Sequence, residues 1–199
     1  MFVSIDKPGT LLKLEVKKSR FFGFCYMVES EDGAKAMISE LVRVYSDATH
    51  VCYAYVCGSV MRFSDAGEPS GTAGMPILNA IKARGLDNAL VVVVRYFGGV
   101  KLGVGGLMRA YRECAVSTLD EAGLAEYESC SVYDAVVPSE YISKFNSTLT
   151  TQNASLSIKE YGALSVRLIV SLRTGEKLPD YCTSITFLEQ GYQKVAKKE

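Results

Sequence analysis

The pattern of apolar residues in the first two thirds of the chain predicts alternating strands and helices. The apolar side chains of residues 32–45 recur on one helical stripe, as expected of a helix that covers a sheet. Residues 89–94 form a short β-branched run typical of a strand buried on both faces. The predicted elements are strands at 9–18, 20–29, 51–58 and 89–94, and helices at 32–45, at 73–84 and from Gly105 or Gly106 onward. Their order is ββαβαβα.

A second domain is predicted after a boundary near residues 124–129, where a charged segment follows the last of these helices. An alternating strand ends at Pro138, and Ser139 then begins a helical run with half of a capping box. Two strands joined by Gly162 form a hairpin, and a last helix is expected from about Pro179 to Glu189. This βαββα series is a ferredoxin-like arrangement that lacks or shortens its final strand. We therefore expect an α+β protein with domains at 1–125 and 131–199.

Two glycine-rich blocks, at 64–74 and 95–111, hold eight of the seventeen glycines. Glycine is costly to order and accepts either sign of φ, so these blocks indicate tight backbone geometry. The first block is acidic and hydroxylated, whereas residues 88–112 contain four basic residues and no acid. Function is expected in these two blocks.

The second block predicts an anion site at the start of its helix. A glycine-rich entry leaves the first-turn N–H groups uncovered, and the helix dipole favours negative charge there. The candidate anion- or nucleic-acid-binding residues are Arg95, Lys101, Gly103, Gly105, Gly106, Arg109 and Arg112. The alternative is a structural turn that only allows close packing. Neither the Walker motif nor the complete dinucleotide fingerprint is present, so the sequence does not favour a nucleotidase or a dehydrogenase.

The first block offers Asp65 and Glu68 as an acid and base pair or as ligands of Mg²⁺. Acids before a helix more often only complement its dipole. Pro76 suits the first turn of the following helix, with Ser70 or Thr72 capping it or lying just upstream. No metal or cofactor is expected, because the single histidine, His50, lacks further zinc ligands nearby and a catalytic pair with Cys52 has little support.

The two blocks, in this order, resemble the YigZ/IMPACT family. The resemblance begins at KKSRF (17–21) and continues through HVCYAY (50–55), SDAGEPSGTAG (64–74) and VVVVRYFGGVKLGVGGLMRAY (91–111). It departs from the family at Ala66, where a second acid is usual, which weakens a two-carboxylate or metal role for this loop.

The resemblance implies a first domain similar to the second domain of ribosomal protein S5. It also implies a ferredoxin-like second domain similar to the last domain of elongation factor G. Eukaryotic members of the family restrain the starvation-activated kinase of translation initiation by competing for its activator on ribosomes, with an additional domain for that contact.

The charge and the apolar pattern of the chain limit its expected binding partners and cellular location. With 22 basic and 22 acidic residues the chain has little long-range attraction to a polyanion, so binding to nucleic acid would be local. There is no apolar leader pattern and no apolar run near the roughly 20 residues that span a bilayer, so a cytoplasmic location without membrane contact is expected.

Two functions remain after these arguments. The favoured one is a non-enzymatic regulator of translation or of a stress response. It would bind the ribosome, RNA or a translation-associated protein through the cationic Gly-rich patch. The alternative is an enzyme acting on a phosphorylated or peptide-like small molecule, with the acidic loop 64–74 beside the anion site.

Overall fold

The computed structural model describes residues 1–152 and 154–195, and the chain divides between Ala125 and Glu126 into two compact units. The elements of the first unit are β1 (Phe2–Ile5), β2 (Gly9–Val16), β3 (Ser19–Met27), α1 (Glu31–Val44), β4 (His50–Cys57), β5 (Val60–Ser64), α2 (Gly74–Ala83), β6 (Ala89–Tyr96) and α3 (Val104–Ala122). Strand β7 (Leu124–Pro138) begins in the first unit and continues into the second.

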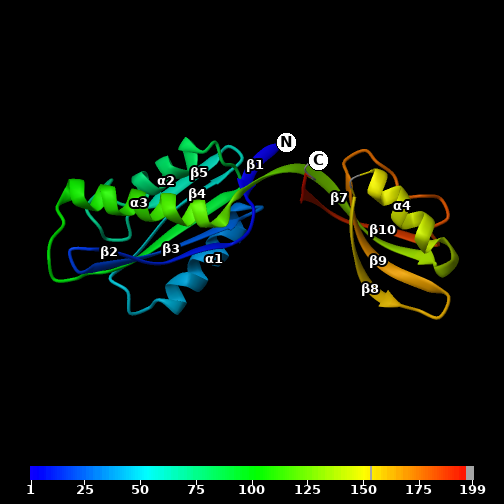
Figure 1. The fold of residues 1–199 in the computed structure, drawn as a ribbon, viewed down its shortest axis with the longest axis horizontal. Coiled ribbons are helices and arrows are strands. Elements are labelled where there is room, and N and C mark those ends of the chain that lie inside the picture. Colours follow the sequence, from blue (N-terminus) through cyan, green and yellow to red (C-terminus); the bar gives the residue numbers. More distant parts are fainter. Residues whose placement is uncertain (153, 196–199) are drawn as a thin grey trace. The chain divides into compact units, whose positions relative to one another are not determined.

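The first unit is built on an antiparallel five-stranded sheet in the order β2-β3-β6-β4-β5. Helices α2 and α3 cover one face and α1 covers the other (Figure 1). The central strand β6 is buried on both faces, because Val91 and Val93 pack against α2 and α3 while Leu90, Val92 and Val94 pack on the side of α1. The prediction of a doubly buried strand here is confirmed.

The termini of α2 and α3 follow local backbone chemistry. Pro76 lies in the first turn of α2, and Gly85, with φ of 63°, follows the helix in the left-handed conformation that glycine adopts at low cost. Helix α3 begins at Val104 after Gly103, whose φ is 73°, slightly earlier than the sequence predicted.

The second unit packs one helix on an antiparallel sheet in the order β10-β7-β9-β8. Its elements after β7 are η1 (Ser139–Tyr141), α4 (Ile142–Thr151), β8 (Ser155–Tyr161), β9 (Ser165–Arg173) and β10 (Ser184–Lys194). Phe145 and Leu149 of α4 contact the apolar face of β7 and β9. The predicted hairpin joined at Gly162 is confirmed.

The prediction of a last helix at 179–189 is wrong. Residues 174–183 form turns and irregular backbone, and β10 then pairs with β7 from Ser184 opposite Val136 to Lys194 opposite Tyr127. Pro179 resembled the first position of a helix, but Thr183, Ile185 and Phe187 are β-branched or aromatic, and the edge of β7 supplies the hydrogen bonds of a strand. The second unit therefore has a final strand and no second helix in this described segment. The mixed α+β class is confirmed.

Candidate functional site

The acidic loop is anchored by Asp65, which lies between β5 and α2. Its Oδ1 accepts hydrogen bonds from the backbone N–H groups of Ala73 and Gly74, at 2.9 and 2.8 Å, and its Oδ2 accepts one from Gly71 at 2.8 Å. Burial opposes ionisation of this carboxyl, but the three backbone donors together lower its pKa below the ordinary value. Asp65 therefore caps α2.

Neither hydroxyl that the sequence offered as a cap fills that role. Thr72 Oγ1 donates to the carbonyl of Pro69 at 2.7 Å, and the N-cap position itself is Ala73. Ser70 and Thr72 lie upstream of the helix, which is the other position that the sequence allowed.

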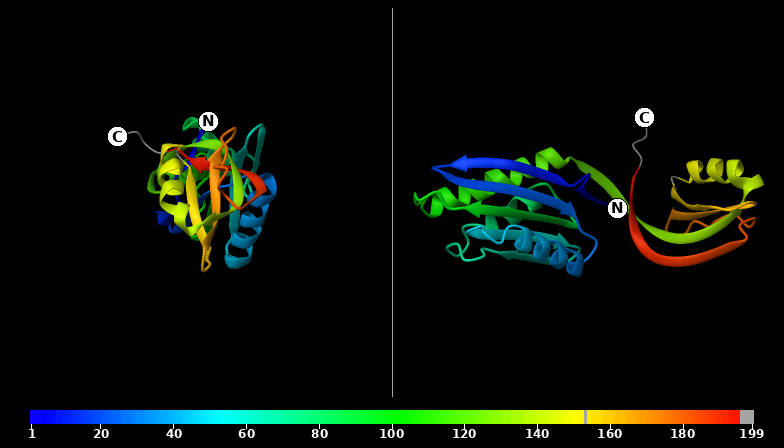
Figure 2. Two further views of the ribbon diagram at one scale, coloured as in Figure 1. Left: turned by 90° about the vertical axis from the view of Figure 1, so that its right-hand side faces the viewer. Right: turned by 90° about the horizontal axis from the view of Figure 1, so that it is seen from below.

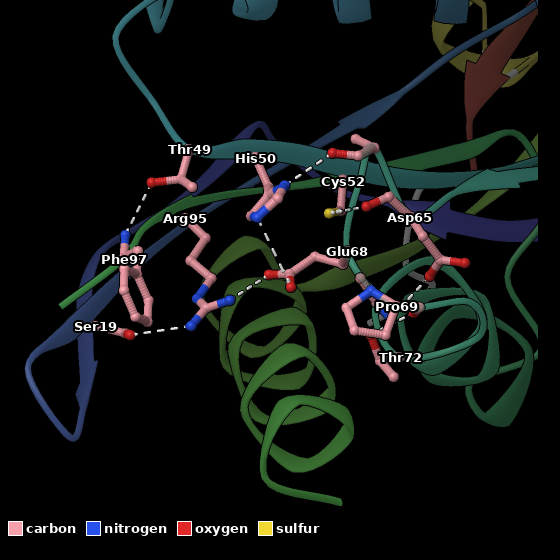
Figure 3. Close-up of polar contacts among 12 residues, drawn as sticks. Ser19, Thr49, His50, Cys52, Asp65, Glu68, Pro69, Thr72, Arg95 and Phe97 are labelled. Carbon is pink, nitrogen blue, oxygen red and sulfur yellow. Dashed lines mark hydrogen bonds and ion pairs between the residues drawn. The ribbon is translucent and has the colours of Figure 1, made fainter. Parts of the chain in front are cut away.

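Glu68 lies inside the first unit, with its side chain 3% exposed, at the centre of a polar network (Figure 3). Its Oε1 accepts hydrogen bonds from Arg95 Nη1 at 2.6 Å and from Tyr111 Oη at 2.7 Å. Its Oε2 lies 3.8 Å from His50 Nε2. The carboxylate thus has its counter-ion and its donors within the protein.

Arg95 holds this network to the β2–β3 turn. Its Nη2 donates to Ser19 Oγ at 3.2 Å, and its guanidinium carbon lies 5.5 Å from the ring centroids of both Phe21 and Phe97. Arg95 is 4% exposed, and its Nε is buried with no partner in the described residues. The expectation that Arg95 binds an external anion conflicts with this placement, since its charge is matched by Glu68 in the interior.

His50 and Cys52 contact the acidic loop separately. His50 Nδ1 lies 2.9 Å from the carbonyl oxygen of Ala66, and Cys52 Sγ lies 3.1 Å from that of Asp65. Burial raises the pKa of the Cys52 thiol to about 12, although its contact with Tyr111 lowers it in part. Cys52 is therefore a protonated thiol at neutral pH and a poor nucleophile.

The start of α3 contrasts with the other two helices of this unit. Helix α1 is capped by Ser30, which accepts from Gly33 N at 3.0 Å, and α2 is capped by Asp65. Helix α3 has no side-chain cap at Gly103 and no acid in its first turn. Its first-turn N–H groups are left for solvent or an anion.

Cationic residues precede and follow this uncapped turn along the chain. Arg109 Nη1 lies 3.5 Å from the position that a Cβ on Gly105 would occupy, so the guanidinium lies beside the first turn. Lys101 is exposed on the preceding loop, and Arg112 is exposed one turn further along α3. No ion pair joins Lys101, Arg109 or Arg112 to an acid within residues 1–152 and 154–195.

A groove of about 440 Å³ lies between α2 and α3, next to these cations. It is lined by Met75, Pro76, Asn79, Ala83, Met108, Arg109 and Arg112. Both methionines are exposed large hydrophobic residues, so the groove combines apolar walls with two guanidinium groups. We define Lys101, Arg109, Arg112 and the first turn of α3 as the cationic surface.

The structure thus separates the residues that the sequence grouped. Gly103, Gly105, Gly106 and Arg109 come together at the start of α3, whereas Arg95 belongs to the buried network with Glu68. Sequence reasoning missed Tyr111 as a partner of Glu68, 43 residues away, because Tyr111 fits the apolar stripe of α3. The signal that could have found it is that a buried acid needs donors.

No helix in the described part of the chain is long and apolar enough to cross a membrane. Across the same residues, His, Cys, Asp and Glu side chains nowhere gather in groups of three or more that could hold a metal ion.

Comparison with known proteins places these features in a family. Residues 17–119 match the model of the Impact N-terminal domain, which contains the whole of the buried network and the cationic surface. The chain is 42% identical over 117 residues to IMPACT family member YvyE of Bacillus subtilis, covering 57% of this chain and 54% of that protein. It is 49% identical over 107 residues to an IMPACT family member of Thermus thermophilus, covering 54% of this chain and 58% of that protein.

The likeness extends further along the chain in one solved structure. A crystal structure described as that of a hypothetical protein is 31% identical, with a TM-score of 0.63, and the match covers 86% of this chain and 84% of that one. The chain spans about half the length of the curated relatives it matches. Because the family model covers more than half of its residues, the chain belongs to the IMPACT family.

Proposed function

We propose that this protein is a non-enzymatic regulator of translation or of a stress response that binds the ribosome, RNA or a translation-associated protein through the cationic surface. The observation that carries the proposal is the uncapped start of α3 with the Arg109 guanidinium beside its first turn. The uncovered backbone N–H groups, the helix dipole and this guanidinium each favour a phosphate.

The lack of internal partners for these cations supports an external ligand. Lys101, Arg109 and Arg112 are exposed, and the described acids form no ion pair with them. The chain has no net charge, so long-range attraction is weak and the contact would depend on these few groups. We expect modest, salt-sensitive affinity.

The two acids of the first glycine-rich block give less support to an enzyme. Asp65 is occupied by three backbone donors, and Glu68 is paired with Arg95 and hydrogen-bonded to Tyr111. A general base needs access to the proton that it removes, and a Mg²⁺ ligand needs free lone pairs towards the ion. Both acids instead organise the entry to α2 and the interior of the sheet.

Membership of the IMPACT family directs the proposal towards translation. The family resemblance implies a role at ribosomes for its eukaryotic members, and the residues of the cationic surface lie within the matched domain. We propose the same class of target for this chain, reached through the first unit.

The experiment is co-sedimentation with ribosomes, and binding to total RNA, across a range of salt concentrations. Lys101→Ala with Arg109→Ala should weaken binding and reduce the slope of log Kobs against log salt by about 1.4–1.8, the effect of two phosphate contacts on a single strand or a duplex. Lys7→Ala with Lys177→Ala is the control, because it removes the same charge from exposed residues elsewhere. Equal binding by the two double variants would contradict the proposed surface.

A further inference from the structure

The lysine pair of the KKSRF segment is not explained by the cationic surface. Lys17 and Lys18 form the two-residue turn between β2 and β3, where Val16 pairs with Ser19. Both lysines are exposed and have positive φ, 47° and 67°. Such a turn prefers Asn-Gly, and each residue with a Cβ costs about 1–2 kcal/mol in this conformation. Two lysines are therefore placed where the backbone disfavours them, and such strain is characteristic of functional positions.

The turn is fixed against the loop that follows β6. A Cβ on Gly98 would lie 2.0 Å from the carbonyl carbon of Lys18, so the two backbones are in direct contact. Ser19 Oγ accepts hydrogen bonds from Gly98 N and from Arg95 Nη2, both at 3.2 Å. The lysine turn and the segment around Gly98 thus form one rigid piece, at the same end of the first unit as the start of α3 (Figures 1 and 2).

Phe97, next to Gly98, exposes an aromatic ring on this piece. Its side chain is 46% exposed, yet its backbone N–H donates to Thr49 Oγ1 at 2.9 Å and the Arg95 guanidinium lies 5.5 Å from its ring centroid (Figure 3). The ring is therefore supported from within the protein. Tyr53 and Tyr55, two other aromatic residues of this unit, instead pack in the hydrophobic cluster on the side of α1.

We propose that Phe97 and the lysine turn form a platform for unpaired RNA, on which a base stacks against Phe97 while neighbouring phosphates contact Lys17, Lys18 and Lys101. An exposed, supported ring beside point charges on a rigid backbone is the arrangement that binds single strands. Lys101 lies three residues after Gly98, within about 11 Å along even a fully extended chain. Glu15, the acid on the adjoining part of β2, is paired with Lys13 at 2.8 Å.

The inference rests on the proposed function and specifies its ligand. An acidic protein segment would also contact the lysines, but it would not need a flat aromatic surface. Stacking on Phe97 is therefore the feature to test.

The chain contains no tryptophan, so Phe97→Trp introduces a unique fluorescent reporter. Titration with a short oligoadenylate should quench its emission, because a base stacks on the indole, whereas inorganic phosphate at equal ionic strength should not. Phe187→Trp is the matched control, since Phe187 is 52% exposed on β10 of the second unit. Phe97→Ala should weaken oligoadenylate binding roughly tenfold, as expected for loss of one stacked base.

A second variant separates charge from stability. Lys17→Asn with Lys18→Gly installs the residues that the turn prefers, so the melting temperature should not fall. Binding of oligoadenylate should nevertheless weaken, and the salt slope should fall by about 1.4, which is two contacts on a single strand. An unquenched Phe97→Trp, or unchanged binding by the turn variant, would overturn the platform.

The outcomes also distinguish this inference from the proposed function. If ribosomes bind the wild type, Phe97→Ala and the turn variant equally, the platform is wrong and the proposed function stands. If the wild type binds no ribosomes but oligoadenylate quenches Phe97→Trp, the platform stands and the ribosomal role is wrong.

Discussion

Replacement of Glu68 by glutamine tests whether the acidic loop is structural. Glu68 and Arg95 are 3% and 5% exposed in their side chains, and their closest atoms lie 2.6 Å apart. Glu68→Gln removes the negative charge but keeps an acceptor for Tyr111, so the main loss is the counter-ion of a buried guanidinium. Removing one partner of a buried ion pair costs about 3–5 kcal/mol of stability. Because glutamine keeps the acceptor for Tyr111, we expect a loss at the lower end, about 3 kcal/mol. The melting temperature should fall by on the order of 10 °C.

The assay is urea unfolding combined with hydrogen exchange at the amides of β6. Strand β6 is central and buried on both faces, so its amides exchange when the first unit unfolds globally. The control is Glu68→Gln with Arg95→Met, which removes both charges of this buried pair. This double variant should be more stable than Glu68→Gln alone by about 1 kcal/mol or more. A loss below about 1 kcal/mol for Glu68→Gln, or simple addition of the two changes, would show that Glu68 and Arg95 do not depend on each other in the folded protein.

The remaining predictions concern the loops on either side of this network. Asp65→Asn should cost about 1 kcal/mol at pH 7 in urea unfolding. Because the pKa of Asp65 is lower in the folded state, its contribution to stability is present above the unfolded pKa of about 3.9 and is lost as the pH falls through the folded pKa. A stability difference between the wild type and Asp65→Asn that stays constant down to about pH 2 would contradict this. Ala66→Asn should raise the free energy of unfolding by about 0.5 kcal/mol and raise the melting temperature with it, because Ala66 has φ of 44° and asparagine tolerates this conformation better than alanine. A lower melting temperature would contradict this prediction. Gly98→Ala should destabilise the folded protein by about 2 kcal/mol or more, because the added Cβ would collide with Lys18. Gly105→Ala should not, because its Cβ would lie in a helix with its nearest neighbour 3.5 Å away. Equal melting temperatures for the two variants would show that the backbone at Gly98 moves to relieve the collision.

Much of the first unit could be predicted from the sequence, because its elements have strong local signals. The apolar run of β6, the helical stripe of α1 and the Pro76 to Gly85 bounds of α2 correspond closely to the structure. The sequence did not predict strands β1 and β5, because Phe2–Ile5 and Val60–Ser64 are too short for a clear alternating pattern, and β5 runs directly into the first glycine-rich block. Strand β10 was mistaken for a helix because its pairing with β7 is a long-range contact that local propensity does not show.

In the candidate site, too, local features could be predicted from the sequence and long-range contacts could not. The glycine-rich start of α3 is a local feature, and its position was predicted to within a few residues. The pairing of Glu68 with Arg95 and Tyr111 spans 27 and 43 residues, so it depends on how the sheet and α3 come together. Phe97 gave no sequence signal of its own, because neither its exposure nor the contact of the neighbouring Gly98 with Lys18 can be seen in the local sequence.

The most direct test of the cationic surface is a titration of the protein with inorganic phosphate, followed by NMR at the backbone amides of residues 103–107. We expect these amides to shift most and Lys101→Ala with Arg109→Ala to abolish the shifts, because the N–H groups of the uncapped turn and the two cations bind the anion together. Shifts confined to other amides, with residues 103–107 unchanged, would contradict it.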